Sequence, residues 1–256
     1  MVGVVQSVDR ALSILELISN YNEGLGITDI SESLGLHKST VHRLLGTLIY
    51  KGYVVQDQVS LKYKLTTKLF ELGNKIIEGK DILEASKAHT EALMRRLNEV
   101  VHLVIRDGTD IVYIDKVEAS DSFSMMRMAS NIGRRSPLYS TSVGKAMLAF
   151  MDEEEVAEIW NASKIVKLTE KTITDFDEFM KELEKIRQLG YAEDDEENEL
   201  GVRCIGAPIF NSWGEVEGAI SISGPTIRIT KEKIDEIAEE VKKCAYSISK
   251  ELGYRG

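Results

Sequence analysis

The chain has 256 residues, of which 43% are hydrophobic and 29% are charged. That length suits two domains of about 100–200 residues each, and the composition is that of a globular protein that needs no disulfide bonds. The net charge of −10 argues against a nucleic-acid partner, if the charge is evenly spread. The two cysteines and four histidines lack the spacing of metal ligands, so we expect no metal ion and no cofactor. We also expect a cytoplasmic protein with reduced thiols and no membrane contact, because we find neither a signal peptide nor an apolar run of about 18 residues.

The charge is in fact unevenly distributed along the chain. Residues 33 to 70 contain a single acid, Asp57, and six bases: Lys38, Arg43, Lys51, Lys62, Lys64 and Lys68. A local basic surface matters more for phosphate contact than the total charge does. This part of the chain is therefore the candidate nucleic-acid-binding region.

The first 66 residues carry the pattern of a small DNA-binding domain. Apolar residues recur at helical spacing, which predicts helices over residues 7–20, 28–34 and 38–50. Thr28 is the expected N-cap of the second helix, and Gly35 allows a tight turn before the third. Alternating residues then predict a hairpin with strands over 53–55 and 61–65. Three helices followed by a hairpin predict a winged helix-turn-helix over residues 1–66.

The remaining residues predict a linker helix over 67–79 and a larger domain over 80–256. Glycine-rich turns separate the segments, including a hairpin signal at residues 107–110. We expect helices over 81–98, 140–150, 175–189 and 230–252, and strands over 100–105, 111–117, 122–128, 202–210 and 215–223. Hairpins with helices packed outside them predict an α+β domain with an antiparallel sheet and flanking helices.

The third helix is the predicted DNA-reading element. Its polar face combines short side chains with Arg43, which could bond a guanine edge or hold a phosphate. The candidate DNA contacts are Lys38, Ser39, Thr40, His42, Arg43, Thr47 and the wing residues Lys62 and Lys64. A solvated helix face is the alternative, but the order of elements and the acid-free run over residues 33–56 favour DNA.

The second domain resembles the effector domain of the IclR family, the isocitrate-lyase-regulator-type transcription factors. The resemblance rests on the spacing of Gly190, Asp194, Glu197, Cys204-Ile205-Gly206 and Ile209-Phe210-Asn211. Further matches are Ser136-Pro137-Leu138, Ser142-Val143-Gly144-Lys145-Ala146, Ile220-Ser221-Ile222-Ser223-Gly224-Pro225 and, near the N-terminus, Gln6-Ser7-Val8-Asp9-Arg10-Ala11-Leu12. The resemblance covers nearly the whole chain.

This resemblance implies a GAF-like effector domain, dimers or tetramers, and a small organic acid as effector. The implied effector-binding residues are Met125, Met128, Ser142, Val143, Asp194, Cys204, Ser221 and Ser223. The residues themselves fit this chemistry. Backbone N–H groups at the helix start near Ser142 can meet an anion, and two serines spaced by two face one side of a strand. Ionised Asp194 can accept a hydrogen bond from a ligand hydroxyl.

Other roles remain open for several of these residues. On a regular strand Met125 and Met128 would point to opposite faces, so only one of them would line the pocket. Cys204 fits a small buried hydrophobe, and we expect Lys145 to be solvated. We interpret Gly144 as keeping the first helical turn open to a ligand. Ser136 and Ser142 make the rim more polar than the family pattern, which favours a sugar acid or hydroxy acid over a keto acid.

The sequence therefore predicts a DNA-binding transcriptional regulator, more specifically a repressor, that binds an inverted-repeat operator as a homodimer or tetramer. A carboxylate or sugar-acid effector would change its operator affinity. Two other classes are kept as alternatives: a catalytic domain acting on a small acid and fused to a DNA anchor, and a structural DNA-binding dimer without a ligand. We do not expect an enzyme, because we find no phosphate loop, metal cluster or nucleophile with its base in the sequence.

Overall fold

The computed structural model describes residues 3–77, 81–118 and 131–256, and it divides the chain into two compact units, Met1–Gly79 and Lys80–Gly256. The predicted strand at 122–128 lies outside the described residues. No helix in the described ranges is long and apolar enough to cross a membrane.

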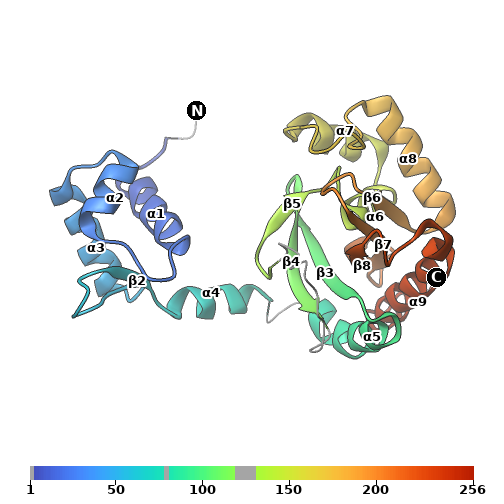
Figure 1. Cartoon of the computed structure of the whole chain (residues 1–256), viewed down its shortest axis with the longest axis horizontal. Coiled ribbons are helices and arrows are strands. Elements are labelled where there is room, and N and C mark those ends of the chain that lie inside the picture. Colours follow the sequence, from blue (N-terminus) through green and yellow to red (C-terminus); the bar gives the residue numbers. More distant parts are fainter. Residues whose placement is uncertain (1–2, 78–80, 119–130) are drawn as a thin grey trace. The chain divides into compact units, whose positions relative to one another are not determined.

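The first unit contains three helices followed by a two-stranded hairpin (Figure 1). These are α1 (Gln6–Ser19), α2 (Ile27–Leu34), α3 (Lys38–Tyr50), β1 (Val54–Gln56) and β2 (Tyr63–Leu65), and α4 (Lys68–Ile77) follows them. Ile14, Ile30 and Leu45 are buried where the three helices meet. The loop before α2 also pairs with the hairpin through a bridge between Leu25 and Tyr63, so the wing is joined to the helices by main-chain hydrogen bonds.

Two local expectations for this unit were wrong, the N-cap of the second helix and the start of the second strand of the hairpin. Thr28 lies inside α2, and the N-cap is Gly26, whose N–H donates to the Asp29 carboxylate at 3.2 Å. Leu61 is exposed and precedes β2, although the predicted strand included it. Leu61 lies in the turn of the hairpin with a φ of 57°, so it does not continue the alternation of the strand. The helix begins just after Gly26 because the Asp29 side chain bonds the Gly26 N–H, and the strand begins later because the turn of the hairpin includes position 61.

The second unit is built on a six-stranded sheet in the order β5-β4-β3-β8-β7-β6, in which all paired neighbours are antiparallel. The strands are β3 (Val100–Asp107), β4 (Asp110–Val117), β5 (Arg135–Pro137), β6 (Ala192–Asp195), β7 (Val202–Phe210) and β8 (Val216–Pro225). The two short edge strands, β5 and β6, were not predicted, because three or four residues carry too little alternation to be recognised.

Helices cover both faces of this sheet. On one face, α5 (Asp81–Leu97) and α9 (Ile234–Glu251), which follows the short 3-10 helix η1 (Lys231–Lys233), enclose a core of aliphatic residues. The other face carries α6 (Ser142–Leu148), with α7 (Glu153–Ala162) and α8 (Phe176–Leu189) packed beyond it (Figure 1). Sequence reasoning missed α7, and α6 is shorter than the predicted 140–150. The fold is the expected α+β arrangement of a helix-turn-helix unit and an antiparallel sheet with flanking helices.

Candidate DNA-binding and effector sites

The polar face of α3 lies in solvent, opposite its buried residues Val41, Leu45 and Leu48. Lys38, Ser39, His42, Arg43 and Thr47 are exposed, and Thr40 is half-buried. Within the described part of the chain, no acidic group forms an ion pair with Arg43 or Lys38. The turn between α2 and α3 is closed by Gly35, whose φ of 62° is left-handed. The helix-turn-helix therefore presents an unneutralised cationic surface.

The wing contributes two further cations beside this helix. Lys62 and Lys64 are half-buried, and the Lys64 ammonium lies 3.7 Å from the Glu23 carboxylate. The Glu23 side chain of this ion pair is exposed, so the pair contributes little to stability and is weakened by salt. A phosphate could replace Glu23 at little cost, which leaves Lys64 available for DNA.

In the second unit, one end of the sheet face beneath α6 is polar. Asp194, Cys204 and Ser223 are paired neighbours across β6, β7 and β8, so their side chains share a face. Two residues further along, Ser221 is paired with His102 of β3 on the same face. We call the following seven residues the polar cluster: His102, Tyr113, Ser136, Asp194, Cys204, Ser221 and Ser223. Most of its members are buried, whereas the other end of the same face is apolar.

Sequence reasoning did not select two members of the cluster, His102 and Tyr113. The rings of these two residues meet edge to face at 5.1 Å, His102 Nδ1 lies 3.2 Å from Ser223 Oγ, and Tyr113 bonds Ser136. Burial, together with Lys116, lowers the pKa of His102 to about 3, and burial raises the pKa of Tyr113 to about 12. Both rings are therefore neutral at physiological pH. A histidine and a tyrosine at inward-facing strand positions were the available signal, but only the strand register brings His102 beside Ser223 and Tyr113 beside His102.

The start of α6 lies directly on the sheet beside this cluster. A side chain at Gly206 of β7 would meet the backbone of Ser142 and Val143 at 2.9 Å. Thr141 is the N-cap, because its hydroxyl accepts from the Gly144 N–H at 3.2 Å. Ser142 is buried, and the Val143 side chain packs into the apolar core, so only the backbone of Val143 can face the cluster.

Gly144 has a different role from the one that the sequence suggested. A Cβ at this position would lie 2.1 Å from the Leu138 carbonyl oxygen. The glycine therefore allows α6 to pack against the preceding segment, and it does not serve to keep the helix start open to a ligand.

The remaining predicted effector residues differ in how they are placed. Met125 and Met128 lie outside the described residues. The Cys204 thiol bonds Ser223, and burial raises its pKa above the usual range, which favours a neutral thiol. In the described ranges, no group of three His, Cys, Asp or Glu side chains could hold a metal ion.

Asp194 is buried, and its Oδ1 accepts hydrogen bonds from the backbone N–H groups of Glu197 and Asn198 at 2.7 and 3.2 Å. These bonds make Asp194 part of the turn that it begins. Burial raises the pKa of its carboxyl to about 7, against the opposing effect of Lys145. The carboxyl is thus close to its titration point near neutral pH.

This shift predicts a pH-dependent difference in the free energy of unfolding between the wild type and Asp194→Asn. Because the pKa of Asp194 is about 7 in the folded state and its ordinary value is 3.8, its contribution is complete below pH 3.8 and is lost as pH rises to about 7. Urea unfolding between pH 4.5 and 8 should show the variant gaining relative to the wild type up to about pH 7, with no further change above. A difference that does not vary with pH would contradict the raised pKa.

Lys145 was expected to be solvated, and this expectation was wrong. It is fully buried, and its ammonium pairs with the Glu197 carboxylate. A lysine one turn into a helix is usually at the surface, but here α6 is enclosed by the sheet and α8.

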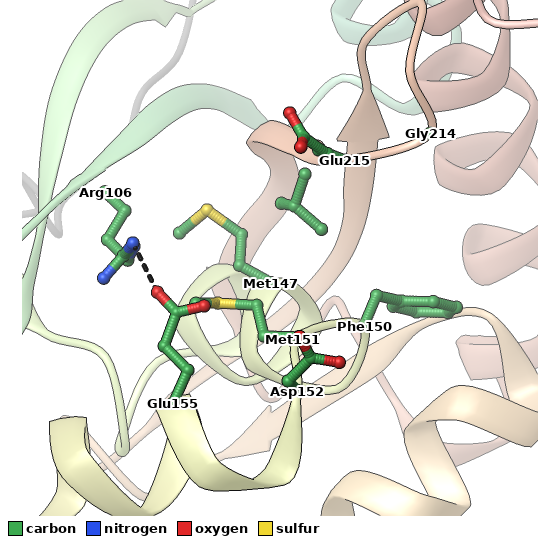
Figure 2. Close-up of a pocket in the computed structure, with 9 residues that line it drawn as sticks. Arg106, Met147, Phe150, Met151, Asp152, Glu155, Gly214 and Glu215 are labelled. Carbon is green, nitrogen blue, oxygen red and sulfur yellow. Dashed lines mark hydrogen bonds and ion pairs between the residues drawn. The ribbon is translucent and has the colours of Figure 1, made fainter.

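A cavity of about 380 Å³ lies near the C-terminal end of α6 (Figure 2). Met147, Phe150 and Met151 line it, and Arg106 faces Glu155 across it at 2.8 Å. It contains none of the predicted effector residues.

Comparison with known proteins identifies the family. The profile of the IclR helix-turn-helix domain matches residues 7–58, and that of the bacterial transcriptional regulator IclR C-terminal domain matches residues 74–250. The chain belongs to the IclR family of bacterial transcriptional regulators. The resemblance found in the sequence is thereby confirmed, as is the expectation of a regulator that is not an enzyme.

Individual IclR relatives match over almost their whole length. The HTH-type transcriptional regulator KdgR of Escherichia coli is 40% identical over 250 residues, which cover 98% of this chain and 94% of KdgR. The DNA-binding transcriptional repressor YiaJ of the same species is 37% identical, with 97% and 88% covered. The crystal structure of the Thermotoga maritima IclR has a TM-score of 0.83 at 36% identity and covers 97% of this chain and 99% of that one.

Proposed function

We propose that this IclR-family protein is a cytoplasmic repressor that binds an inverted-repeat operator and is switched by a sugar acid or hydroxy acid. The observation that carries the effector half is the polar cluster. Burying polar side chains costs free energy unless each one is paired, so a fold that needs only a core would have apolar residues there. The other end of the same sheet face has such residues, among them Val104, Ile111 and Ala219.

The chemistry of the cluster favours a ligand rich in hydroxyl groups. Ser221, Ser223 and Ser136 can each donate or accept a hydrogen bond, and Asp194 can accept from a ligand hydroxyl. The backbone at Ser142 and Val143, at the positive end of α6, suits the ligand carboxylate. Met125, Met128 and Cys204 would complete the contacts, as the family resemblance implies.

The DNA half of the proposal rests on the exposed, cationic α3 and the wing. Two such units in a homodimer, or pairs of them in a tetramer, would read half-sites about 10–10.5 base pairs apart. In this arrangement residues 1–66 bind DNA, and the linker over 67–79, which contains α4, joins them to the effector domain over 80–256. The relatives KdgR and YiaJ carry the names of a regulator and a repressor, which supports this direction of control.

The proposal is tested first by a thermal-shift screen of the purified full-length protein against D-gluconate, D-galacturonate, glycerate, pyruvate and glyoxylate. A ligand that binds only the folded protein stabilises it by about 2.7 kcal/mol at one hundred times its Kd. We expect sugar or hydroxy acids to raise Tm and the keto acids to have little effect. Tight binding of pyruvate or glyoxylate alone would contradict the sugar-acid assignment.

Replacing both serines, in Ser221→Ala/Ser223→Ala, should abolish the shift in Tm produced by the best acid of the screen. Each lost hydrogen bond to a ligand hydroxyl is worth about 0.5–1.5 kcal/mol, so the loss of both should lower the affinity by about tenfold or more. Ser247→Ala, at a half-buried position on α9 outside the polar cluster, is the control. Equal shifts in the wild type and the double variant would place the effector elsewhere.

Operator binding provides the second half of the test. In gel-shift titrations the same acid should change the operator affinity of the wild type, because an effector must prefer one DNA-binding state over the other. If an acid binds but leaves the DNA affinity unchanged, this result would contradict the proposed switch. Conversion of the acid to a product would favour the catalytic alternative, and a screen without any binder would favour the structural dimer.

A further inference from the structure

The ammonium of Lys145 lies in the interior of the second unit, between α6, α8 and the turn that follows β6. It pairs with Glu197, and the Glu182 carboxylate of α8 lies 4.0 Å away. Burying such a pair costs desolvation free energy that mutual attraction barely repays, and an apolar pair of similar size is often at least as stable. Stability alone therefore does not account for a buried ion pair at this position.

Glu197 belongs to the turn over residues 194–198, which begins at Asp194, near the end of β6. The Glu197 N–H donates to Asp194 Oδ1 at 2.7 Å, and the Glu197 carbonyl accepts from Thr172 Oγ1 at 2.7 Å. At the other end of the turn, Ser140 Oγ donates to Asn198 Oδ1 at 3.3 Å. The pairing of β6 with β7 fixes the backbone of Asp194, and the turn holds the orientation of its carboxyl.

Lys145 connects this turn to the helix that carries the other half of the site. Lys145 is three residues after Ser142, so its backbone moves with the start of α6. Glu197 Oε2 is buried and makes no hydrogen bond within the described residues, so Oε1 and Lys145 carry the side-chain attachment of Glu197. The pair joins the helix that begins at Ser142 to the turn that bonds Asp194 Oδ1.

We propose that Lys145 is a positioning residue for the effector site: through Glu197 it ties the α6 start, where the effector carboxylate would bind, to Asp194, which would bind an effector hydroxyl. This inference rests on the effector site proposed above and assigns a role to a residue that does not itself touch the effector.

The charge of Lys145 has a second consequence for the same site. Around Asp194, the acids Glu197 in the turn, Glu193 of β6 and Glu182 of α8 all face the buried ammonium or lie near it. Lys145 lowers the pKa of Asp194, and this effect is larger than the opposing effect of Glu197. Without both charges, Asp194 would ionise at higher pH, and its acceptance of a ligand hydroxyl would begin at higher pH.

The test compares the full-length wild type with Lys145→Met and with the double variant Lys145→Met/Glu197→Leu. The single variant leaves Glu197 buried without its partner and should lower Tm markedly. The double variant fills the same space with apolar groups, so its Tm and its operator affinity without effector should return close to those of the wild type. The control is Arg106→Met/Glu155→Leu, which removes an exposed ion pair near the other end of α6 (Figure 2).

D-Gluconate is the probe for effector binding, by isothermal titration between pH 5.5 and 8.5. For the double variant we expect a Kd at least about tenfold weaker than that of the wild type, equivalent to about 1.4 kcal/mol. We also expect the midpoint of the pH profile to move upward. The control should bind as the wild type does. If the double variant recovers both Tm and gluconate affinity with an unmoved pH profile, the pair is only a packing element and the proposal is overturned.

Amide hydrogen exchange separates this inference from the proposed function, because it needs no ligand. In the double variant the amides of Glu197 and Asn198 should exchange faster than in the wild type and the control. If gluconate does not bind the wild type but these amides exchange faster, the sugar-acid assignment fails and the positioning role stands. Unchanged exchange at both amides would overturn the positioning role, whatever the protein binds.

Discussion

Replacement of Arg43 by alanine should weaken operator binding by about 1–3 kcal/mol and relax the sequence preference at one base pair of each half-site. Arg43 is exposed on α3 and forms no ion pair within the described part of the chain, so its guanidinium is free to bond the edge of a guanine at two points. The measurement is a fluorescence-anisotropy titration of the wild type and the variant against the operator and against a panel of single-base substitutions.

The matched comparison is Lys38→Ala, on the same exposed surface of α3. If Lys38 contacts a phosphate, its loss should weaken binding to all sequences by a similar factor. It should also reduce the slope of log K against log salt concentration by about one. Loss of affinity without loss of specificity in Arg43→Ala would assign Arg43 to a phosphate as well. Unchanged binding in both variants would mean that this face of α3 is only solvated.

The second large effect is expected from Gly144→Ala, which should destabilise the effector domain. Intrinsic propensity alone would favour alanine in a helix by about 1 kcal/mol. The added methyl group, however, would lie 2.1 Å from the Leu138 carbonyl oxygen and 2.6 Å from its Cα, both of which are backbone atoms. Overpacking of this kind costs about 1–3 kcal/mol, and occasionally more, so the destabilising effect should prevail.

Gly46→Ala is the control for this prediction. Gly46 also lies inside a helix, but a Cβ there would meet nothing within 4 Å. It should therefore show only the favourable propensity effect of alanine. Thermal and urea unfolding of the two variants should move in opposite directions from the wild type. A stabilised Gly144→Ala would mean that α6 can shift away from Leu138 without cost.

The α6 start packs against the sheet at the polar cluster through positions that have no side chain. Gly206 lets the helix start lie on β7, and Ser221 is its paired neighbour on β8. A larger residue at Gly206 would push against the backbone of Ser142 and Val143, and one at Gly144 would push against the backbone of Leu138. We therefore attribute the glycines of the family motifs at positions 144 and 206 to close contact between backbones, because only glycine lacks a side chain that would prevent it.

Local pattern was sufficient to predict most of the elements and the exposed face of α3. The helical spacing of Val41, Leu45 and Leu48 determined which face of α3 is buried, and therefore which polar residues face solvent. The family motifs likewise placed Asp194, Cys204, Ser221 and Ser223 in one region of the chain. Short elements escaped prediction, because β5 and β6 are fixed by their neighbours in the sheet and not by their own few residues.

The sequence by itself thus determined the order of most elements, the solvent-facing side of α3 and the membership of a regulator family. What only the tertiary structure decided is which residues meet. Strand register placed His102 beside Ser223 and Tyr113 beside His102. The enclosure of α6 turned Lys145 from an expected surface residue into the buried partner of Glu197. Periodicity records which side of an element is buried, whereas pairing between distant segments depends on register and packing, which no local pattern contains.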